Sequence, residues 1–179
     1  GITDEQAEEL IKSGADKVYL MNAPALKDFI AENYSNVIED LINEYKPEII
    51  LAAATSMGRT VMPYVAIKTD AGLTADCTEL DIEKDTGNLL QTRPAFGGNL
   101  MATIICPEHR PQMSTVRPGV MVKEDPNYER TGKIEYLEAD LNDQDLDSEI
   151  TNQGVILKIN PEFDEQDVLS EIIHIVKEA

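Results

Sequence analysis

The sequence contains no tryptophan, and aromatic residues make up only 5% of its 179 residues. Leucine, isoleucine, valine and alanine must therefore supply most of the core, and a hydrophobic fraction of 42% is enough to fill one. The sequence also lacks an apolar run of membrane-spanning length and a basic-then-apolar N-terminal signal. We therefore expect no membrane insertion, and a single domain at this length.

Basic residues are scarce, since 15 lysines and arginines stand against 34 acidic residues and give a formal net charge of −19. Binding to nucleic acid requires a basic footprint, and docking on anionic membranes requires a basic patch, so this charge argues against both partners. It favours solubility and basic protein partners. The simpler interpretation of this net charge is an acidic surface with no specific role. The alternative is that the negative charge attracts basic partner proteins.

Cysteine and histidine are also rare, and each occurs twice: Cys77, Cys106, His109 and His174. The cysteines have neither the spacing of metal ligands nor a disulfide framework, which predicts a reducing, cytoplasmic compartment. Both lie among apolar residues in expected strands, so we interpret them as buried, inert thiols. Two histidines are too few for a metal site, and we expect no bound metal.

No catalytic set follows from the remaining acidic residues. Asp76, Glu79 and Asp81 surround Cys77, but strand alternation places Asp76 on the face opposite the other two carboxylates. A poised acid–base pair is therefore not implied. An enzyme with a Cys77 nucleophile is the least favoured of the hypotheses.

The chain is organised around the unbroken apolar run Ile49–Ala54, which a polar loop (residues 55–59) and a helix expected over Thr60–Lys68 follow. Such a run is typical of a strand covered on both faces in an α/β sheet, where ligands bind beyond the carboxyl ends of the strands. The candidate phosphate-binding residues of this loop are Thr55, Ser56, Gly58 and Arg59. The loop matches no phosphate-binding fingerprint, so a packed interface loop is the favoured alternative.

Before this run, the pattern predicts helix, strand and helix. A capping box at Thr3–Gln6 begins a helix that ends near Lys12, and Lys17–Met21 is a short buried strand. Pro24 opens a helical stretch to Tyr45 with a candidate break at residues 33–35. This order implies right-handed crossovers and a parallel sheet with helices on its faces.

From Leu73 the pattern changes to short strands. Leu73–Glu83 and Leu89–Phe96 are expected to form a hairpin, and a tight turn, Gly97-Gly98-Asn99, follows it. Other strands are expected at residues 100–107, 112–116, 120–122, 134–141 and 155–159, an acidic solvated run at 142–149 and a helix from Asp164 to the end. The predicted single domain (1–179) thus has a helix and parallel-strand part (1–72), a β-rich part (73–161) and a C-terminal helix (162–179).

Arginine occurs five times, and three arginines precede proline: Arg93, Arg110 and Arg117. A following proline favours extended backbone and holds the guanidinium in place. Arg59, Arg93 and Arg117 could converge on carboxylates or phosphates in bidentate fashion. An internal ion-pair network that braces the β region and an interface or ligand site remain two open alternatives.

Four segments carry a family resemblance through their order and spacing: residues 55–59, Leu73–Cys77, Arg93–Asn99 and Arg110–Gly119. Together they resemble the N-terminal domain of the electron transfer flavoprotein alpha subunit, and the resemblance covers nearly the whole chain. It implies an α/β, Rossmann-like three-layer domain of the adenine-nucleotide alpha hydrolase-like type with a β-rich extension. The interface or structural residues that we expect are Arg93, Gly97, Gly98, Asn99 and Arg117.

This resemblance implies a scaffold and docking domain that pairs with an electron transfer flavoprotein beta subunit. The heterodimer would carry electrons between flavin dehydrogenases, such as acyl-CoA dehydrogenase, and other carriers in a prokaryotic cytoplasm. The family binds FAD mainly through its C-terminal domain, so FAD is expected in the full-length subunit and not in this chain alone. We expect the chain to be a partial N-terminal domain whose last helix leads to a missing FAD domain. The alternative is a self-contained nucleotide-binding domain that uses residues 55–59.

Overall fold

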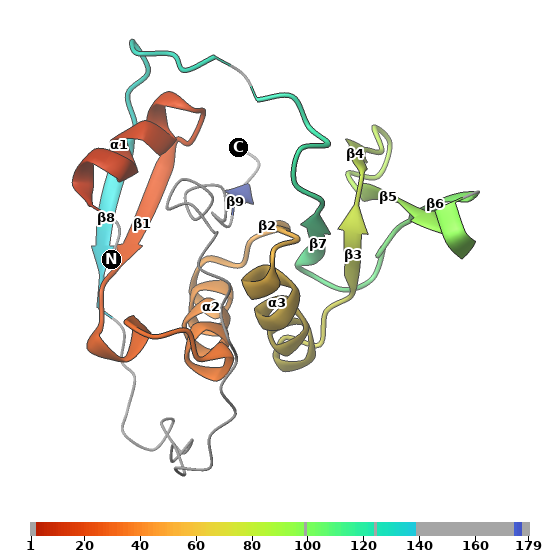
Figure 1. The fold of residues 1–179 in the computed structure, drawn as a ribbon, viewed down its shortest axis with the longest axis horizontal. Coiled ribbons are helices and arrows are strands. Elements are labelled where there is room, and N and C mark those ends of the chain that lie inside the picture. The colour runs from red at the N-terminus through yellow and green to blue at the C-terminus, as the bar shows by residue number, and fades with distance from the viewer. Residues whose placement is uncertain (1–2, 99, 124, 139–173, 177–179) are drawn as a thin grey trace.

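The computed structural model describes residues 3–98, 100–123, 125–138 and 174–176, and they form a mixed α/β, Rossmann-like domain with parallel strands and packed helices (Figure 1). The elements in chain order are α1 (Asp4–Lys12), β1 (Lys17–Met21), the 3-10 turn η1 (Pro24–Leu26), α2 (Ala31–Tyr45), β2 (Ile49–Ala53), α3 (Ser56–Lys68), β3 (Leu73–Cys77), β4 (Glu79–Ile82), β5 (Leu89–Ala95), the 3-10 turn η2 (Phe96–Gly98), β6 (Leu100–Ile104), β7 (Gln112–Val116), β8 (Lys133–Leu137) and β9 (His174–Val176).

The main sheet has the strand order β3-β7-β2-β9. Strands β2 and β3 each pair in parallel with β7, whereas β9 runs antiparallel to β2. Strand β7 therefore inserts between two strands that α3 connects in the sequence. The carboxyl ends of β2, β3 and β7 consequently lie at the same edge of the sheet, and this edge positions the candidate site.

Helices α2 and α3 pack on each other and enclose the main core with this sheet. Ile50 and Met113 are neighbours in the β2–β7 register, and both are fully buried. Met62 and Val65 of α3 are also fully buried, because they lie one turn apart on the same helix face. The apolar run at Ile49–Ala54 thus forms the central strand that its composition predicted.

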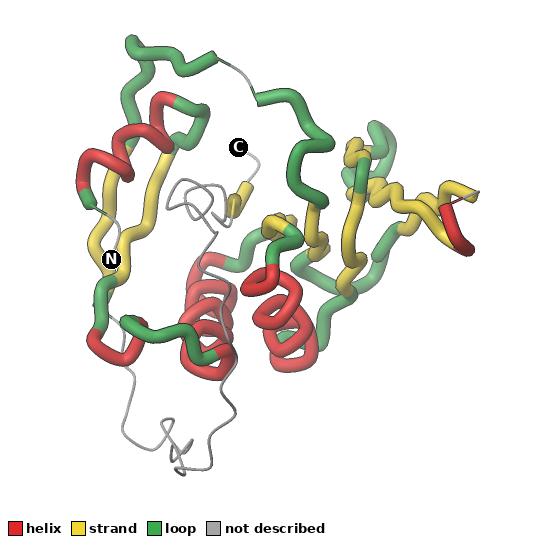
Figure 2. The backbone as a smooth tube through the Cα atoms, in the orientation of Figure 1, coloured by secondary structure: helices red, strands yellow, loops and turns green. Residues whose placement is uncertain are grey.

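A second, smaller sheet joins β1 to β8, which are distant in the sequence and pair in parallel. Helix α1 packs on this sheet and buries Ala7 and Ile11 against Val18 and Leu20. The predicted capping box at the start of α1 is confirmed, since Thr3 and Gln6 exchange side-chain-to-backbone hydrogen bonds. The connection from β7 to β8 is a long loop, which Figure 2 shows crossing from one sheet to the other.

The third sheet is an antiparallel ribbon, β4-β5-β6, that extends away from the helices (Figure 1). The predicted hairpin is confirmed only in part. Its second strand, β5, pairs with β4, whereas Leu73–Cys77, the start of the predicted first strand, joins the main sheet as β3. The predicted single strand is broken at Thr78, between β3 and β4, and β3 is already irregular at Asp76, which has a φ of 63°.

Two helix boundaries differ from the prediction. The break between η1 and α2 lies at residues 27–30 and not at residues 33–35. Asn33 and Ser35 are buried within α2 because their side chains donate hydrogen bonds to the carbonyls of Ala25 and Glu32. Helix α3 begins at Ser56, so most of the expected 55–59 loop is its first turn.

The strands of the second half are shorter than expected. The strand predicted over 100–107 ends at Ile104, that over 134–141 is β8, ending at Leu137, and no strand forms at 120–122. Residues 174–176, predicted to be helical, form β9 instead. The β-branched run Ile172, Ile173, Ile175 and Val176 favours a strand as much as a helix. The predictions for 142–149 and 155–159, and the rest of the last helix, lie outside the described residues.

Candidate functional site

The candidate site lies at the carboxyl edge of the main sheet, where the segments after β2, β3 and β7 meet. Backbone hydrogen bonds join these ends, since the Ala54 amide donates to the Val116 carbonyl at 2.7 Å and the Arg117 amide to the Cys77 carbonyl at 2.9 Å. Parallel strands that end together bring residues distant in the sequence to one place. Arg59, Asp76 and Arg117 come together in this way.

The Asp76 carboxylate accepts hydrogen bonds from two arginines. Nη2 of Arg59 lies 3.0 Å from Oδ1 of Asp76. Arg117 binds the same carboxylate through two nitrogens, with Nε 3.3 Å from Oδ1 and Nη2 2.6 Å from Oδ2. Bidentate arginine–carboxylate geometry is strong and directional, so Asp76 fixes the orientation of both guanidinium groups.

A local irregularity of β3 directs Asp76 to this position. The register between β3 and β7 shifts between Thr74 and Cys77, and Asp76 adopts a positive φ. Its amide donates to the Thr115 side-chain oxygen at 2.9 Å. Such bulges redirect a side chain, and aspartate tolerates the left-handed region better than most residues. The alternation pattern of the sequence did not indicate this position.

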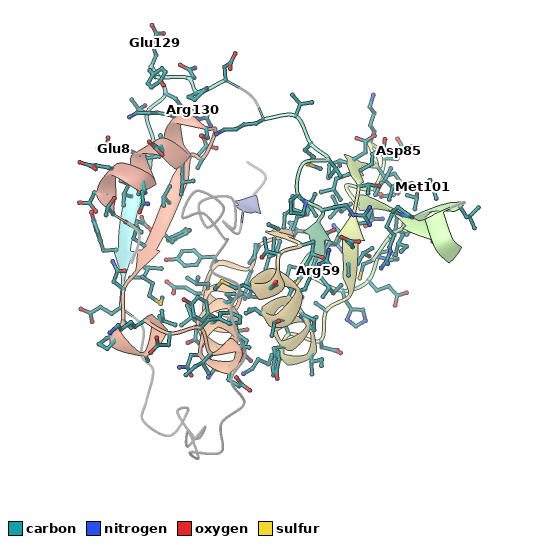
Figure 3. All side chains as sticks on the ribbon, in the orientation of Figure 1. Glu8, Arg59, Asp85, Met101, Glu129 and Arg130 are labelled. Atoms are coloured by element: carbon teal, nitrogen blue, oxygen red, sulfur yellow. The ribbon has the colours of Figure 1, made fainter. Side chains whose placement is uncertain are left out.

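Arg59 is held from its own helix as well. Its Nε donates to the Ala54 carbonyl at 2.7 Å, which anchors the guanidinium at the end of β2. Figure 3 shows Arg59 in the first turn of α3, and the side chain remains 55% exposed. The predicted convergence of arginines is therefore present for Arg59 and Arg117, and its centre is an internal carboxylate.

The third member of what we call the arginine cluster (Arg59, Arg93 and Arg117 around Asp76) comes from β5. The amide of Thr78, two residues after Asp76, donates to the Thr92 carbonyl at 2.9 Å, which places Arg93 beside this edge of the sheet. The pKa of Asp76 is lowered, mainly by the hydrogen bonds from Arg117. Partial burial opposes this shift, and the positive charges of Arg117, Arg59 and Arg93 add to it. The Asp76 carboxylate in turn raises the pKa of Arg117. Three guanidinium groups thus accompany one carboxylate, and the cluster has a net positive charge in a very acidic chain.

The other candidates of the 55–59 segment, apart from the exposed Ser56 side chain, are engaged in the fold. The Thr55 side chain caps α3 by accepting from the Gly58 amide at 3.2 Å, and the Ser56 carbonyl accepts from Thr60. A Cβ at Gly58 would lie 2.0 Å from the Ala53 carbonyl oxygen. Gly58 therefore allows α3 to pack closely on β2, and its amide is already satisfied.

The predicted turn residues Gly97 and Gly98 lie in η2, directly after β5. Gly97 and Gly98 have φ values of 75° and 88°, and a Cβ added at either glycine would have no neighbour within 4 Å. A positive φ, and not a close backbone approach, is what requires glycine here. Asn99 lies outside the described residues.

The two cysteines differ in their surroundings. Cys77 is fully buried, its Sγ lies 3.0 Å from the Ser114 hydroxyl, and burial raises its pKa, so the thiol resists ionisation. Cys106 is only partly buried and lies in the loop after β6, so the prediction that it lies in a strand is wrong. Both cysteines are free thiols.

The remaining candidates form no second site. Glu79 and Asp81 lie on β4, in a different sheet from Asp76, and Asp81 accepts a hydrogen bond from the next backbone amide. Nδ1 of His109 lies 3.8 Å from Oδ2 of Asp70, and His174 is in β9. No group of three metal-ligating side chains occurs in the described residues.

One shallow cavity lies away from the arginine cluster, between α2 and the ends of β1 and β8. Its volume is about 140 Å³, and its lining residues are Met21, Val37, Asp40, Leu41, Glu44, Leu137 and Glu138. Sites for cofactors occupy about 300–1,000 Å³, so this cavity is too small for a dinucleotide. Within the described ranges, no helix has the length and apolar character needed to cross a lipid bilayer.

Comparisons with known proteins give independent information. The model of the family described as "Electron transfer flavoprotein domain" matches residues 1–142. The chain is 48% identical over 163 residues to the electron transfer flavoprotein subunit alpha of Thermoanaerobacterium thermosaccharolyticum, which covers 91% of this chain and 49% of that protein. It is 52% identical over 121 residues to the subunit of the same name from Clostridium acetobutylicum (68% and 36% covered).

A third relative has a name that refers to an enzyme complex. The LctC subunit of a lactate dehydrogenase (NAD(+),ferredoxin) from Acetobacterium woodii is 46% identical over 134 residues, with 75% of this chain and 32% of that protein covered. The chain therefore spans at most about half the length of these relatives.

Proposed function

The chain belongs to the electron transfer flavoprotein domain family, and from this premise we propose that it is the N-terminal scaffold and docking domain of an alpha subunit. In this proposal it pairs with a beta subunit, and the heterodimer carries electrons between flavin dehydrogenases and other carriers. The observation that supports it most directly is the match to relatives named as alpha subunits over nearly the whole chain.

The proposal assigns FAD to the portion of the full-length subunit that this chain does not cover. Two structural features support that assignment. The cavity between α2 and the β1–β8 sheet, which is one cavity of the described part of the chain, is too small for FAD. In the 55–59 segment, the Thr55 side chain and the Gly58 amide are used in capping α3, and Arg59 is held by the Ala54 carbonyl and by Asp76. When bound in the full subunit, FAD would supply the redox chemistry, and this domain would supply rigid support and partner contacts.

The partner and role follow from the same family membership. We propose an electron-carrier subunit and not a catalyst, because the relatives are named as electron transfer flavoprotein subunits. One relative is named as a subunit of a lactate dehydrogenase, which supports a dehydrogenase as a partner; a flavin dehydrogenase, such as an acyl-CoA dehydrogenase, is the electron donor in our proposal. A cytoplasmic location, which the two free cysteines favour, belongs to this proposal.

The test is co-expression of the full-length alpha subunit with the beta subunit of the same organism. We expect both chains to elute together in size-exclusion chromatography, and we expect the flavin of the complex to be reduced by a partner dehydrogenase with its substrate. Separate elution of the two subunits would contradict the docking role. Tight binding of AMP or ATP to residues 55–59, detected by calorimetry and abolished by Arg59→Gln, would instead favour the nucleotide-binding alternative.

A further inference from the structure

Arg93 differs from every other arginine of this chain. Arg59, Arg110, Arg117 and Arg130 each form an ion pair with a carboxylate. The Arg93 side chain has no hydrogen bond or ion pair within the described part of the chain, although acidic residues outnumber basic ones by 34 to 15. A guanidinium near two further guanidinium groups is repelled by them, and an external anion would relieve this repulsion.

The other two arginines of the cluster also have unused donors. A guanidinium has five N–H donors, and Arg59 and Arg117 each use only Nε and Nη2 within the described residues. Their side chains are 55% and 45% exposed, so the remaining donors are accessible. Asp76 orients these groups but neutralises only one of three positive charges.

An exposed apolar strand adjoins the cluster. Arg93 on β5 is directly opposite Ala102 on β6, where Leu100, Met101 and Ile104 are 55%, 52% and 39% exposed. The outer edge of β6 has no partner strand within the described residues, and Figure 3 shows Met101 at this end of the ribbon. Arginine beside exposed methionine and aliphatic residues is the composition of protein interfaces, and uncovered apolar edges are otherwise prone to aggregation.

The surroundings favour a protein carboxylate over a phosphate as the bound anion. The Arg59 and Arg117 side chains are 55% and 45% exposed, whereas small-molecule sites are concave and bury most of the ligand surface. At the start of α3, the Gly58 amide is already bonded to Thr55, and Gly58 packs directly on Ala53. Charge complementarity with an acidic side chain, together with apolar contacts to β6, suits a protein surface.

We propose that Arg93, together with the free donors of Arg59 and Arg117, binds an aspartate or glutamate of the partner subunit, while β6 packs on apolar residues beside that carboxylate. Asp76 is a positioning residue, because it acts by holding Arg59 and Arg117 in place. This inference rests on the proposed function, since it takes the beta subunit as the partner protein.

The test measures the affinity of the full-length alpha subunit for the beta subunit at several salt concentrations. Arg93→Gln should weaken the complex by about tenfold or more and reduce its salt dependence, as expected for loss of a desolvated charge pair. Its melting temperature should be no lower than that of the unaltered alpha subunit, because the Arg93 side chain has no hydrogen bond to lose and its removal relieves repulsion within the cluster. Arg93→Lys should bind more tightly than Arg93→Gln but less tightly than the unaltered subunit, since lysine keeps the positive charge but lacks the bidentate donors of a guanidinium.

Arg130→Gln is the matched control. It removes the same charge at a place well separated from Arg59 in Figure 3 and should leave affinity unchanged. If no complex forms with the unaltered subunit, the proposed function fails. If a complex forms and Arg93→Gln binds as tightly with the same salt dependence, this inference alone is wrong. Two further results would overturn the inference by assigning the surface to another occupant. One is competition by inorganic phosphate for the arginine cluster, and the other is self-association of the alpha subunit that Arg93→Gln abolishes.

Discussion

Replacing Asp76 with asparagine removes the charge at the centre of the arginine cluster and changes little else. Asparagine has the same shape and tolerates the φ of 63° that the position requires. The variant therefore isolates the ion pairs with Arg59 and Arg117. Alanine at this position would add backbone strain and confuse the interpretation.

The expected magnitude follows from exposure and geometry. Exposed ion pairs contribute about 0.2–1 kcal/mol each to stability, and bidentate geometry places the Arg117 pair at the upper end. The Asp76 side chain is 24% exposed, so solvent screens it less than a fully exposed carboxylate. We expect the free energy of unfolding to fall by about 1–2 kcal/mol, and the melting temperature Tm by roughly 2–8 °C for a domain of this size.

The effect should depend on pH. The cluster lowers the pKa of Asp76 in the folded protein, so its stabilisation is present above the unfolded value of about 3.9 and is lost as the pH falls through the folded pKa. Thermal unfolding followed by circular dichroism should show a clear difference in Tm between the two proteins near neutral pH. That difference should shrink progressively below about pH 4.

Asp16→Asn provides the control, because Asp16 pairs with Arg130 at 2.6 Å but its side chain is 93% exposed. This pair should contribute less than about 0.5 kcal/mol. Equal losses of stability in Asp16→Asn and Asp76→Asn would refute the reasoning. A difference between unaltered protein and Asp76→Asn that persists unchanged in acid would refute it as well.

Gly98→Val should destabilise the protein by about 1–2 kcal/mol, because a β-branched residue is strained at a φ of 88°; a Tm equal to that of the parent would contradict this. Gly58→Ala should cost about 1–3 kcal/mol in urea unfolding, since the added methyl meets the Ala53 carbonyl oxygen, and an unchanged midpoint would show that α3 shifts freely. Alkylation of the folded protein should modify Cys106 and spare the buried Cys77, and mass spectrometry should find a second adduct only after unfolding; rapid native labelling of Cys77 would show that burial does not protect this thiol.

Much of the fold was predictable because its signals are local. The run Ile49–Ala54 has no polar alternation, and it is the central strand β2. The capping box at Thr3–Gln6 is visible in four letters, and it begins α1. Both features need no information from distant parts of the chain.

Features that depend on tertiary contacts were missed. The alternating residues of Leu73–Glu83 predict one strand. In the structure the first half of this segment pairs with β7 and the second half pairs with β5, so two strands form in different sheets. Asn33 and Ser35 resemble a helix break in sequence, but buried hydrogen bonds keep them inside α2. The pairing of β1 with β8 depends on residues over a hundred positions apart and carries no local signal.

The candidate site was predicted in part. Convergence of Arg59 and Arg117 was expected, and the structure brings them together. The carboxylate between them, Asp76, was not predicted to join them, because a positive φ within an alternating pattern is not visible in sequence. The sequence did carry a signal for Asp76, since aspartate tolerates a positive φ. In the structure Asp76 lies near the carboxyl end of β3, as Arg59 and Arg117 lie near those of β2 and β7.

The most direct test of this account is the flavin content of the purified 179-residue chain, measured from its visible absorption and its protein concentration. The account predicts a folded, colourless protein, because FAD would be held by the portion of the subunit beyond this chain. A folded yellow protein with about one FAD per chain, retained through gel filtration, would contradict the claim that this domain is a scaffold and docking platform without a flavin of its own.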